Sequence, residues 1–377
     1  MALGRCISDD LEEGTAALYH DGQLASLREW LDDLSADELA QQPASAVHGA
    51  WIAALTGDAT EAQRLLALAE GAAALEPWVV HVRALMMRDG LDRALLDADL
   101  ALDRLPAGSA WVPNALVVRG TAHALAGAPE RAKDDFATAI ETGLAAGAVG
   151  DVAVAHAQLA LLAAGQGAWG EAAHRARAAQ AHVNDAGLGD YAASAIVHAA
   201  TARLALHEAR NADAREALAC AHRARPLLDH GVPWLTVAVG LEVARAHLSL
   251  AEAGAAKTML SETERVLELR PRLGSLVADV GELHHRMAAA ADGPAGAWAM
   301  SLTEAERRLL PYLATHLTFP EIASRLFISR NTVKSEAISL YRKLGASSRS
   351  EAIERAVDVG LLESFLFPPQ PNLIPYG

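Results

Sequence analysis

The 377-residue sequence predicts an all-α protein in which a long stack of helix pairs precedes a small four-helix domain. Strand-forming residues are scarce, and no run alternates apolar and polar residues with the period of two that a half-buried strand requires. Turn residues recur at intervals of 33 to 44 residues, which is the spacing of helical-repeat solenoids. Near the C-terminus, hydroxyl residues followed by Glu three positions later mark successive helix starts.

The repeated unit is a helix rich in small residues, a short turn and a second helix. The turns are expected at Gly57, Gly90, Gly127, Gly167, Asn211 and Gly254. In the clearest copy, residues 118–140, Gly120 and Ala132 would allow two helices to touch, and Phe136 would plug the next repeat. One pair alone would expose an apolar face, so the pairs must stack. The pattern is similar to the tetratricopeptide repeat, which implies a tetratricopeptide-like α-solenoid.

Six tryptophans fall within the predicted repeats. They are Trp30, Trp51, Trp78, Trp111, Trp169 and Trp234. One interpretation is a row of aromatic rings along a concave groove that holds a ligand or peptide. Packing between repeats is the favoured alternative, because large aromatic residues usually serve cores.

Composition predicts where the domain boundaries lie and in which cellular compartment the protein works. Residues 291–300 contain Gly293, Pro294 and Gly296 and are expected to link the repeat domain, residues 1–290, to the four-helix domain, residues 301–363. Four prolines predict an irregular tail over residues 364–377. The only cysteines, Cys6 and Cys220, give neither a disulfide framework nor a metal-binding spacing, which fits a reducing cytosol.

Neither a signal peptide nor a membrane span is expected. The acidic N-terminus lacks a basic region followed by an apolar core. Residues 152–170 carry no Asp, Glu, Lys or Arg, but they are mostly Ala and are interrupted by Gly165 and Gly167. A span needs about twenty strongly apolar residues, so this segment is interpreted as a buried helix that ends in a turn.

Capping boxes predict where the C-terminal helices begin. The boxes are Thr303 with Glu306, Thr318 with Glu321, and Ser348 with Glu351. In each box the hydroxyl and the carboxylate satisfy backbone donors that the helix cannot pair itself. Ser329 is a fourth N-cap, and Gly345 and Gly360 end the last two helices. The expected helices cover residues 304–314, 319–326, 330–344 and 351–359.

The third of these helices is expected to have one apolar and one basic face. Its inner residues recur at helical spacing and would pack on the second helix. They are Val333, Ala337, Leu340 and Leu344, against Ile322, Ala323, Leu326 and Ile328. Residues 325–349 hold six basic residues and one acidic residue, Glu336, although the whole chain carries a net charge of −15. A cationic patch on an acidic protein indicates a phosphate-bearing partner.

The ordered motifs of residues 302–352 resemble the LuxR/NarL-type helix-turn-helix of bacterial transcription regulators. The resemblance is carried by Leu302, Thr303, Glu306, Glu321, Ile322, Ala323, Leu326, Ser329, Thr332, Val333, Lys334, Arg342, Lys343, Leu344, Gly345, Ser348, Arg349, Glu351 and Ala352. It implies that Lys334, Ser335 and Ile338 face base edges in the major groove. It also implies that six residues lie near phosphates, namely Arg330, Asn331, Thr332, Arg342, Lys343 and Arg349.

The sequence contains no recognisable catalytic or cofactor-binding motif, so no enzyme activity and no cofactor are expected. His207-Glu208 lacks the second His of a zinc-protease helix, and no phosphate-binding Gly-x-x-x-x-Gly-Lys-Ser/Thr loop occurs. Asp97, Asp99 and Asp103 lack the glycine turn and the closing Glu of a calcium loop. The chain thus resembles only the C-terminal half of the large ATP-binding, MalT-like LuxR regulators, either as a shortened regulator or as a fragment.

The resulting hypothesis is a cytoplasmic, bacterial, sequence-specific transcription regulator. The expected partners are double-stranded DNA, a second copy of the chain on a pseudo-palindromic site, and RNA polymerase. The helical repeats would sense an unidentified small molecule or protein effector. The alternative is a protein-interaction scaffold in which the helix-turn-helix is vestigial, a hypothesis that the net negative charge favours.

Overall fold

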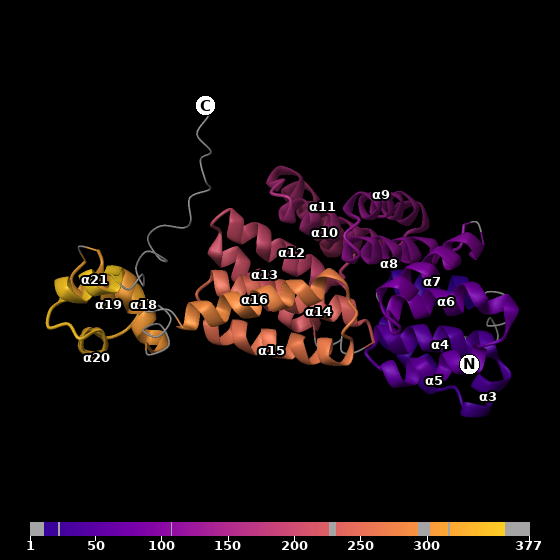
Figure 1. Cartoon of the computed structure of the whole chain (residues 1–377), viewed down its shortest axis with the longest axis horizontal. Coiled ribbons are helices and arrows are strands. Elements are labelled where there is room, and N and C mark those ends of the chain that lie inside the picture. Colours follow the sequence, from indigo (N-terminus) through magenta and orange to yellow (C-terminus); the bar gives the residue numbers. More distant parts are fainter. Residues whose placement is uncertain are drawn as a thin grey trace. The chain divides into compact units, whose positions relative to one another are not determined.

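The computed structural model describes residues 11–21, 23–106, 108–225, 231–292, 302–315 and 317–358. Every regular element among these residues is a helix, which confirms the all-α class (Figure 1). The chain divides into two compact units, Met1–Gly281 and Glu282–Gly377. Helix α16, Ser275–Asp292, begins in the first unit and continues into the second. Most of the expected linker and the whole expected tail lie outside the described residues, so those boundaries stay predictions.

The first unit is a stack of helix pairs. It begins with α1 (Leu11–His20), α2 (Leu24–Asp32) and α3 (Ala36–Gln41). The pairs are α4 (Pro43–Leu55) with α5 (Ala59–Ala69), α6 (Glu76–Met86) with α7 (Leu91–Arg104), α8 (Val112–Leu125) with α9 (Pro129–Ala146), α10 (Val149–Gly165) with α11 (Trp169–Asp185), α12 (Ser194–His207) with α13 (Asn211–Ala224), and α14 (Pro233–Ser249) with α15 (Ala253–Leu269). The first helix of each pair packs on the first helix of the next pair, which confirms the solenoid.

Small residues bring the two helices of a pair together, as the sequence predicts. A Cβ atom on Gly120 in α8 would lie 2.8 Å from the Cε1 of Phe136 in α9, so any side chain there would clash. Ala132, Phe136 and Ala139 are fully buried between the helices. The same contact occurs in the last pair, where Gly240 leaves no room for a side chain beside Thr263. The pairing therefore depends on backbone proximity rather than on large apolar residues alone.

Two of the six predicted turns are misplaced. Gly57, Gly90, Gly127 and Gly167 lie in turns and have positive φ, as expected. Asn211 is instead the first residue of α13, and Gly254 lies inside α15. The left-handed turn residues there are Ala209, with φ 56°, and Ala251, with φ 60°. A search for Gly and Asn misses these turns, because Ala occupies a conformation that those residues adopt more readily.

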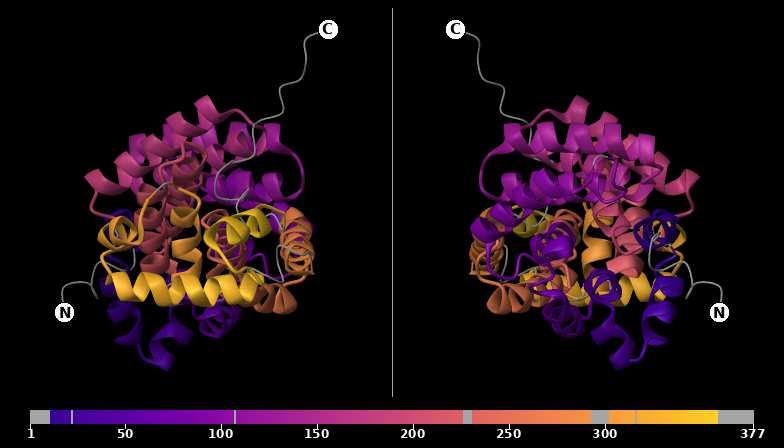
Figure 2. Two further views of the ribbon diagram at one scale, coloured as in Figure 1. Left: turned by 90° about the vertical axis from the view of Figure 1, so that its left-hand side faces the viewer. Right: turned by 90° about the vertical axis from the view of Figure 1, so that its right-hand side faces the viewer.

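The solenoid bends far enough for its last pair to touch its early pairs. The indole N–H of Trp234 in α14 donates to the backbone carbonyl of Leu85 in α6, 3.1 Å away. Gly231 lies against the carbonyl of Ala54 so closely that a Cβ atom would overlap it. In Figure 2 the indigo N-terminal helices and the magenta helices of the middle pairs lie at opposite ends of this unit. Side chains from α4, α6, α8, α10 and α14, each the first helix of its pair, line one interior space.

The tryptophans mostly serve packing. Trp30, Trp51, Trp111 and Trp234 are buried, and the ring centroids of Trp51 and Trp111 lie 3.9 Å apart at a steep angle. This confirms the packing interpretation for these four residues. Trp169 is half-buried and stacks on His207, with ring centroids 3.6 Å apart. Residues 152–170 lie largely in the buried helix α10, as expected. None of the described helices combines the length and the hydropathy that a membrane span requires.

The second unit contains the four expected C-terminal helices. They are α18 (Glu304–Leu313), α19 (Phe319–Leu326), α20 (Arg330–Leu344) and α21 (Arg349–Asp358). They enclose a compact core made of Leu302, Leu309, Leu310, Leu313, Ile322, Ala323, Leu326, Val333, Ala337, Leu340, Leu344, Ala352 and Ala356. The bounds of α19 and α20 match the prediction, and α21 begins two residues earlier than predicted.

Candidate nucleic-acid interface

Capping side chains fix the start of α18, against which α20 packs. The backbone N–H of Thr303 donates to the carboxylate of Glu306 at 2.6 Å, and the N–H of Glu306 donates to the Thr303 hydroxyl at 3.3 Å. Glu306 is 2 % exposed, and its carboxylate also accepts from the Lys343 ammonium at 2.6 Å. Burial raises the pKa of Glu306, but these hydrogen bonds outweigh burial and lower that pKa to about 2.

The remaining caps hold α19 and α21. The N–H of Thr318 donates to the Glu321 carboxylate at 2.7 Å, which confirms the second capping box. The third box is only half formed. The Ser348 hydroxyl accepts from the N–H of Glu351 at 3.2 Å, but the Glu351 carboxylate accepts from the N–H of Ser347 instead. Ser348 therefore caps a helix that starts at Arg349 rather than at Glu351.

A tight turn joins α19 to α20. Phe327 ends α19 in the left-handed conformation, with φ 55°, and its side chain is 95 % exposed. Ser329 then caps α20, because its hydroxyl accepts from the N–H of Thr332 at 3.0 Å. Sequence reasoning did not single out Phe327. Its signal was a large apolar residue directly after the last core position of a helix, where the chain has to reverse.

Helix α20 has the two faces that the sequence predicts. Val333, Ala337, Leu340 and Leu344 are at most 2 % exposed and face the core. On the other face Lys334 and Ser335 are exposed, and Ile338 is 57 % exposed. This surface joins a cation, a hydroxyl and a methyl-bearing chain within about one turn of the helix, and side chains of these kinds are able to contact base edges.

Two arginines and two polar residues flank that face. Arg330, Asn331 and Arg342 are exposed, and the two arginines form no ion pair with any residue in the described part of the chain. Thr332 is half-buried, and its hydroxyl lies 2.8 Å from that of Ser329. The N-terminus of α20 thus presents Arg330 and Asn331 beside helix N–H groups that favour anions.

Two of the predicted phosphate contacts are engaged inside the unit. Lys343 is paired with the buried Glu306. The Arg349 guanidinium donates to four backbone carbonyls around the end of α18: those of Leu313 at 2.8 Å, Leu317 at 2.7 Å, Thr315 at 2.7 Å and Tyr312 at 3.2 Å. These contacts give both residues a structural role that sequence reasoning missed. Their assignment to phosphates stays a prediction.

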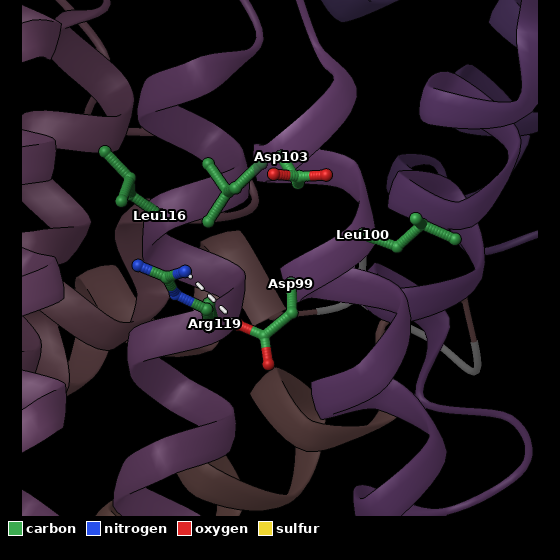
Figure 3. A pocket seen from close by; sticks show the side chains of 6 residues that line it. Asp99, Leu100, Asp103, Leu116 and Arg119 are labelled. Atoms are coloured by element: carbon green, nitrogen blue, oxygen red, sulfur yellow. Dashed lines mark hydrogen bonds and ion pairs between the residues drawn. The ribbon is translucent and has the colours of Figure 1, made fainter.

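The first unit has a surface hollow of about 680 Å³ between α7 and α8 (Figure 3). Asp99 and Asp103 line it together with Arg119, whose guanidinium pairs with Asp99 at 3.2 Å and with the buried Asp135. The cation in the hollow is therefore already neutralised. Across the described residues, no group of three His, Cys, Asp or Glu side chains could hold a metal ion.

Comparisons with known proteins concern the second unit. Residues 300–356 match the model of the luxR family of bacterial regulatory proteins. The chain is 49 % identical over 59 residues to the probable transcriptional regulatory protein SgaR of Hyphomicrobium methylovorum, and 46 % identical over 61 residues to the transcriptional regulatory protein YdfI of Bacillus subtilis. Each match covers 16 % of this chain, and it spans 28 % of SgaR and 29 % of YdfI. The chain is also 40 % identical over 62 residues, again 16 % of its length, to the spore germination protein GerE of Bacillus subtilis, of which it covers 84 %.

Proposed function

This chain belongs to the LuxR family of bacterial regulatory proteins, and we propose that its second unit binds specific double-stranded DNA sites and that the chain thereby regulates transcription. The exposed face of α20 is the observation that carries the proposal. Within the described residues, a family match, exposed basic residues and an exposed helix face coincide on this surface. The names of SgaR and YdfI support the regulatory part.

Helix α20 would lie in the major groove, as the second helix of a helix-turn-helix does. Lys334 can donate to guanine acceptors, Ser335 can bond to several bases, and Ile338 can contact a thymine methyl group. Arg330, Asn331 and Arg342 would hold phosphates on either side of the groove and fix the register. Thr332 would contribute by orienting the cap of α20.

A single four-helix unit reads only a short site, so we propose that two copies of the chain bind a pseudo-palindrome in the bacterial cytoplasm. The first unit would sense an effector or a protein partner and change the DNA affinity of the second. Such coupling requires that the effector bind two states of the chain unequally. RNA polymerase is the proposed partner at the promoter.

The test begins with selection of bound fragments from genomic DNA by the purified full chain, followed by affinity measurements on the preferred site over a range of salt concentrations. The logarithm of the binding constant should fall linearly with the logarithm of the salt concentration. Lys334→Ala should cost about 1–3 kcal/mol of binding free energy on that site. Lys257→Ala removes an exposed lysine from α15 and should leave binding unchanged.

A scaffold with a vestigial helix-turn-helix predicts a different result. In that case no fragment is enriched, and Lys334→Ala and Lys257→Ala behave alike on every duplex at low salt. A third outcome is that the chain binds all duplexes equally and that Lys334→Ala leaves the salt slope unaltered. It would remove the base-reading role of Lys334 and leave only general electrostatic attraction.

A further inference from the structure

A small cavity of about 30 Å³ lies inside the first unit, where the solenoid bends back on itself. Its polar lining comes from elements far apart in the sequence: Tyr19 in α1, Asn114 in α8, Asp151 in α10, and Tyr191 just before α12. Trp234 of α14 and several Val and Leu side chains complete the wall. The cavity therefore exists only in the folded stack, in the interior where the early and late helix pairs meet.

The carboxylate in this cavity lacks a counter-ion. Asp151 is 2 % exposed, and its Oδ1 accepts from the Asn114 amide at 2.6 Å and from the Tyr19 hydroxyl at 3.1 Å. Its Oδ2 has no hydrogen-bond partner, and no basic side chain of the described residues forms an ion pair with it. The first turn of α10 favours an anion, but a buried carboxylate ordinarily also needs a cation or more donors.

Two more polar atoms of the cavity lining lack a hydrogen-bond partner among the described residues, the Asn114 Oδ1 and the Tyr191 hydroxyl oxygen. The Asn114 amide nitrogen donates to both Asp151 and Tyr19, which leaves the Asn114 Oδ1 buried without a partner. The carboxylate and amide oxygens can only accept, and the hydroxyl oxygen of Tyr191 can accept as well, so a group with several donors would satisfy all three. Aromatic rings border the same space, since Tyr19 and Tyr191 lie with ring centroids 5.9 Å apart and Trp234 lines the wall. A protonated amine supplies both the positive charge that Asp151 lacks as a partner and several N–H donors.

We propose that this cavity binds the protonated amino group of a small primary amine, with Asp151 as its counter-ion and Asn114 Oδ1 as a second acceptor. A water-sized group needs about 10–15 Å³, so the space admits an ammonium group with about one carbon attached. The carbon chain of a larger amine would have to displace the apolar wall around Val118 and Val154. Its use as an effector site rests on the proposed sensing role of the repeats, but the binding itself does not.

Methylammonium is the probe that matches the cavity, and saturation-transfer NMR on the full chain without DNA detects its binding. Two non-hydrogen atoms support a Kd of about 10 mM at best. At pH 7.5 and constant ionic strength we expect transfer to methylammonium but not to its neutral isostere methanol. Asp151→Asn should abolish the signal, whereas Asp134→Asn, an exposed carboxylate on α9, should preserve it.

A second variant tests the space rather than the charge. Val154→Phe fills the cavity and leaves Asp151 in place, so it should also abolish the signal while circular dichroism shows an intact helical fold. Absence of transfer to the unmodified chain, or equal transfer in both variants, would overturn the amine site and leave water as the only occupant. DNA affinity measured separately on the same samples shows whether the proposed regulatory function stands.

Discussion

Two buried carboxylates, one in each unit, have opposite environments and opposite pKa shifts. Glu306 in the second unit accepts from a nearby cap residue and from Lys343, and its pKa is lowered to about 2. Asp151 in the first unit has one oxygen without a donor, and burial raises its pKa to about 6, although hydrogen bonds from Asn114 and Tyr19 oppose that rise. The small unit thus satisfies its buried carboxylate with its own donors, whereas the solenoid leaves one oxygen of its buried carboxylate without a donor.

The largest expected effect is the loss of the satisfied carboxylate. Glu306→Ala removes the α18 capping box and leaves the Lys343 ammonium unpaired in a half-buried site, so it should destabilise the second unit by about 3–5 kcal/mol. Hydrogen exchange of the α18–α21 amides in the full chain measures this change. Glu321→Ala, which removes only the exposed box at Thr318, is the matched control and should have a much smaller effect. Equal effects would show that the Lys343 pair adds nothing to the cap.

Replacing the unsatisfied carboxylate should change the stability in the opposite direction. The pKa of Asp151 rises from 3.8 to about 6 on folding, so the unfolded chain ionises first and the folded state loses stability as pH rises through that range. Asp151→Asn should therefore stabilise the chain by up to about 3 kcal/mol at pH 8 and by almost nothing at pH 4. Denaturant unfolding at the two pH values measures this, with Asp134→Asn as a control that shows no such difference. A pH-independent effect of Asp151→Asn would refute the buried, unpaired carboxylate.

The basic residues of the second unit also fall into two groups, those with partners inside the unit and those exposed to solvent. Arg349→Ala removes a guanidinium that holds four carbonyls near the end of α18, so it should cost about 2 kcal/mol of stability in that unit. Arg342→Ala removes an exposed guanidinium and should leave the stability unchanged while reducing the salt slope of DNA binding by about one. If Arg349→Ala left hydrogen exchange unaltered and changed only the salt slope, its phosphate role would be supported over the structural one.

The contrast also explains what the sequence could predict. The bounds of α19 and α20 follow from short-range signals, because Thr318, Ser329 and Gly345 act on residues a few positions away. The roles of Arg349 and Asp151 do not follow, because their partners are remote. Arg349 bonds to carbonyls 32 to 37 residues earlier, and Asp151 accepts from a hydroxyl 132 residues away. Such contacts depend on how the helices pack, and a single sequence does not encode that packing in any local pattern.

The smallest expected effect concerns the turns of the solenoid. Ala209 and Ala251 occupy the left-handed conformation two residues before the second helix of a pair, which is the position that Gly127 occupies in the third pair. This conformation strains any residue with a Cβ atom, so Ala209→Gly should stabilise the first unit by about 0.5–1 kcal/mol. Gly127→Ala should destabilise it by a similar amount, because no atom lies near the added Cβ and only the backbone strain changes. Thermal unfolding should therefore show shifts of opposite sign, and shifts of the same sign would mean that packing, rather than backbone conformation, decides these turns.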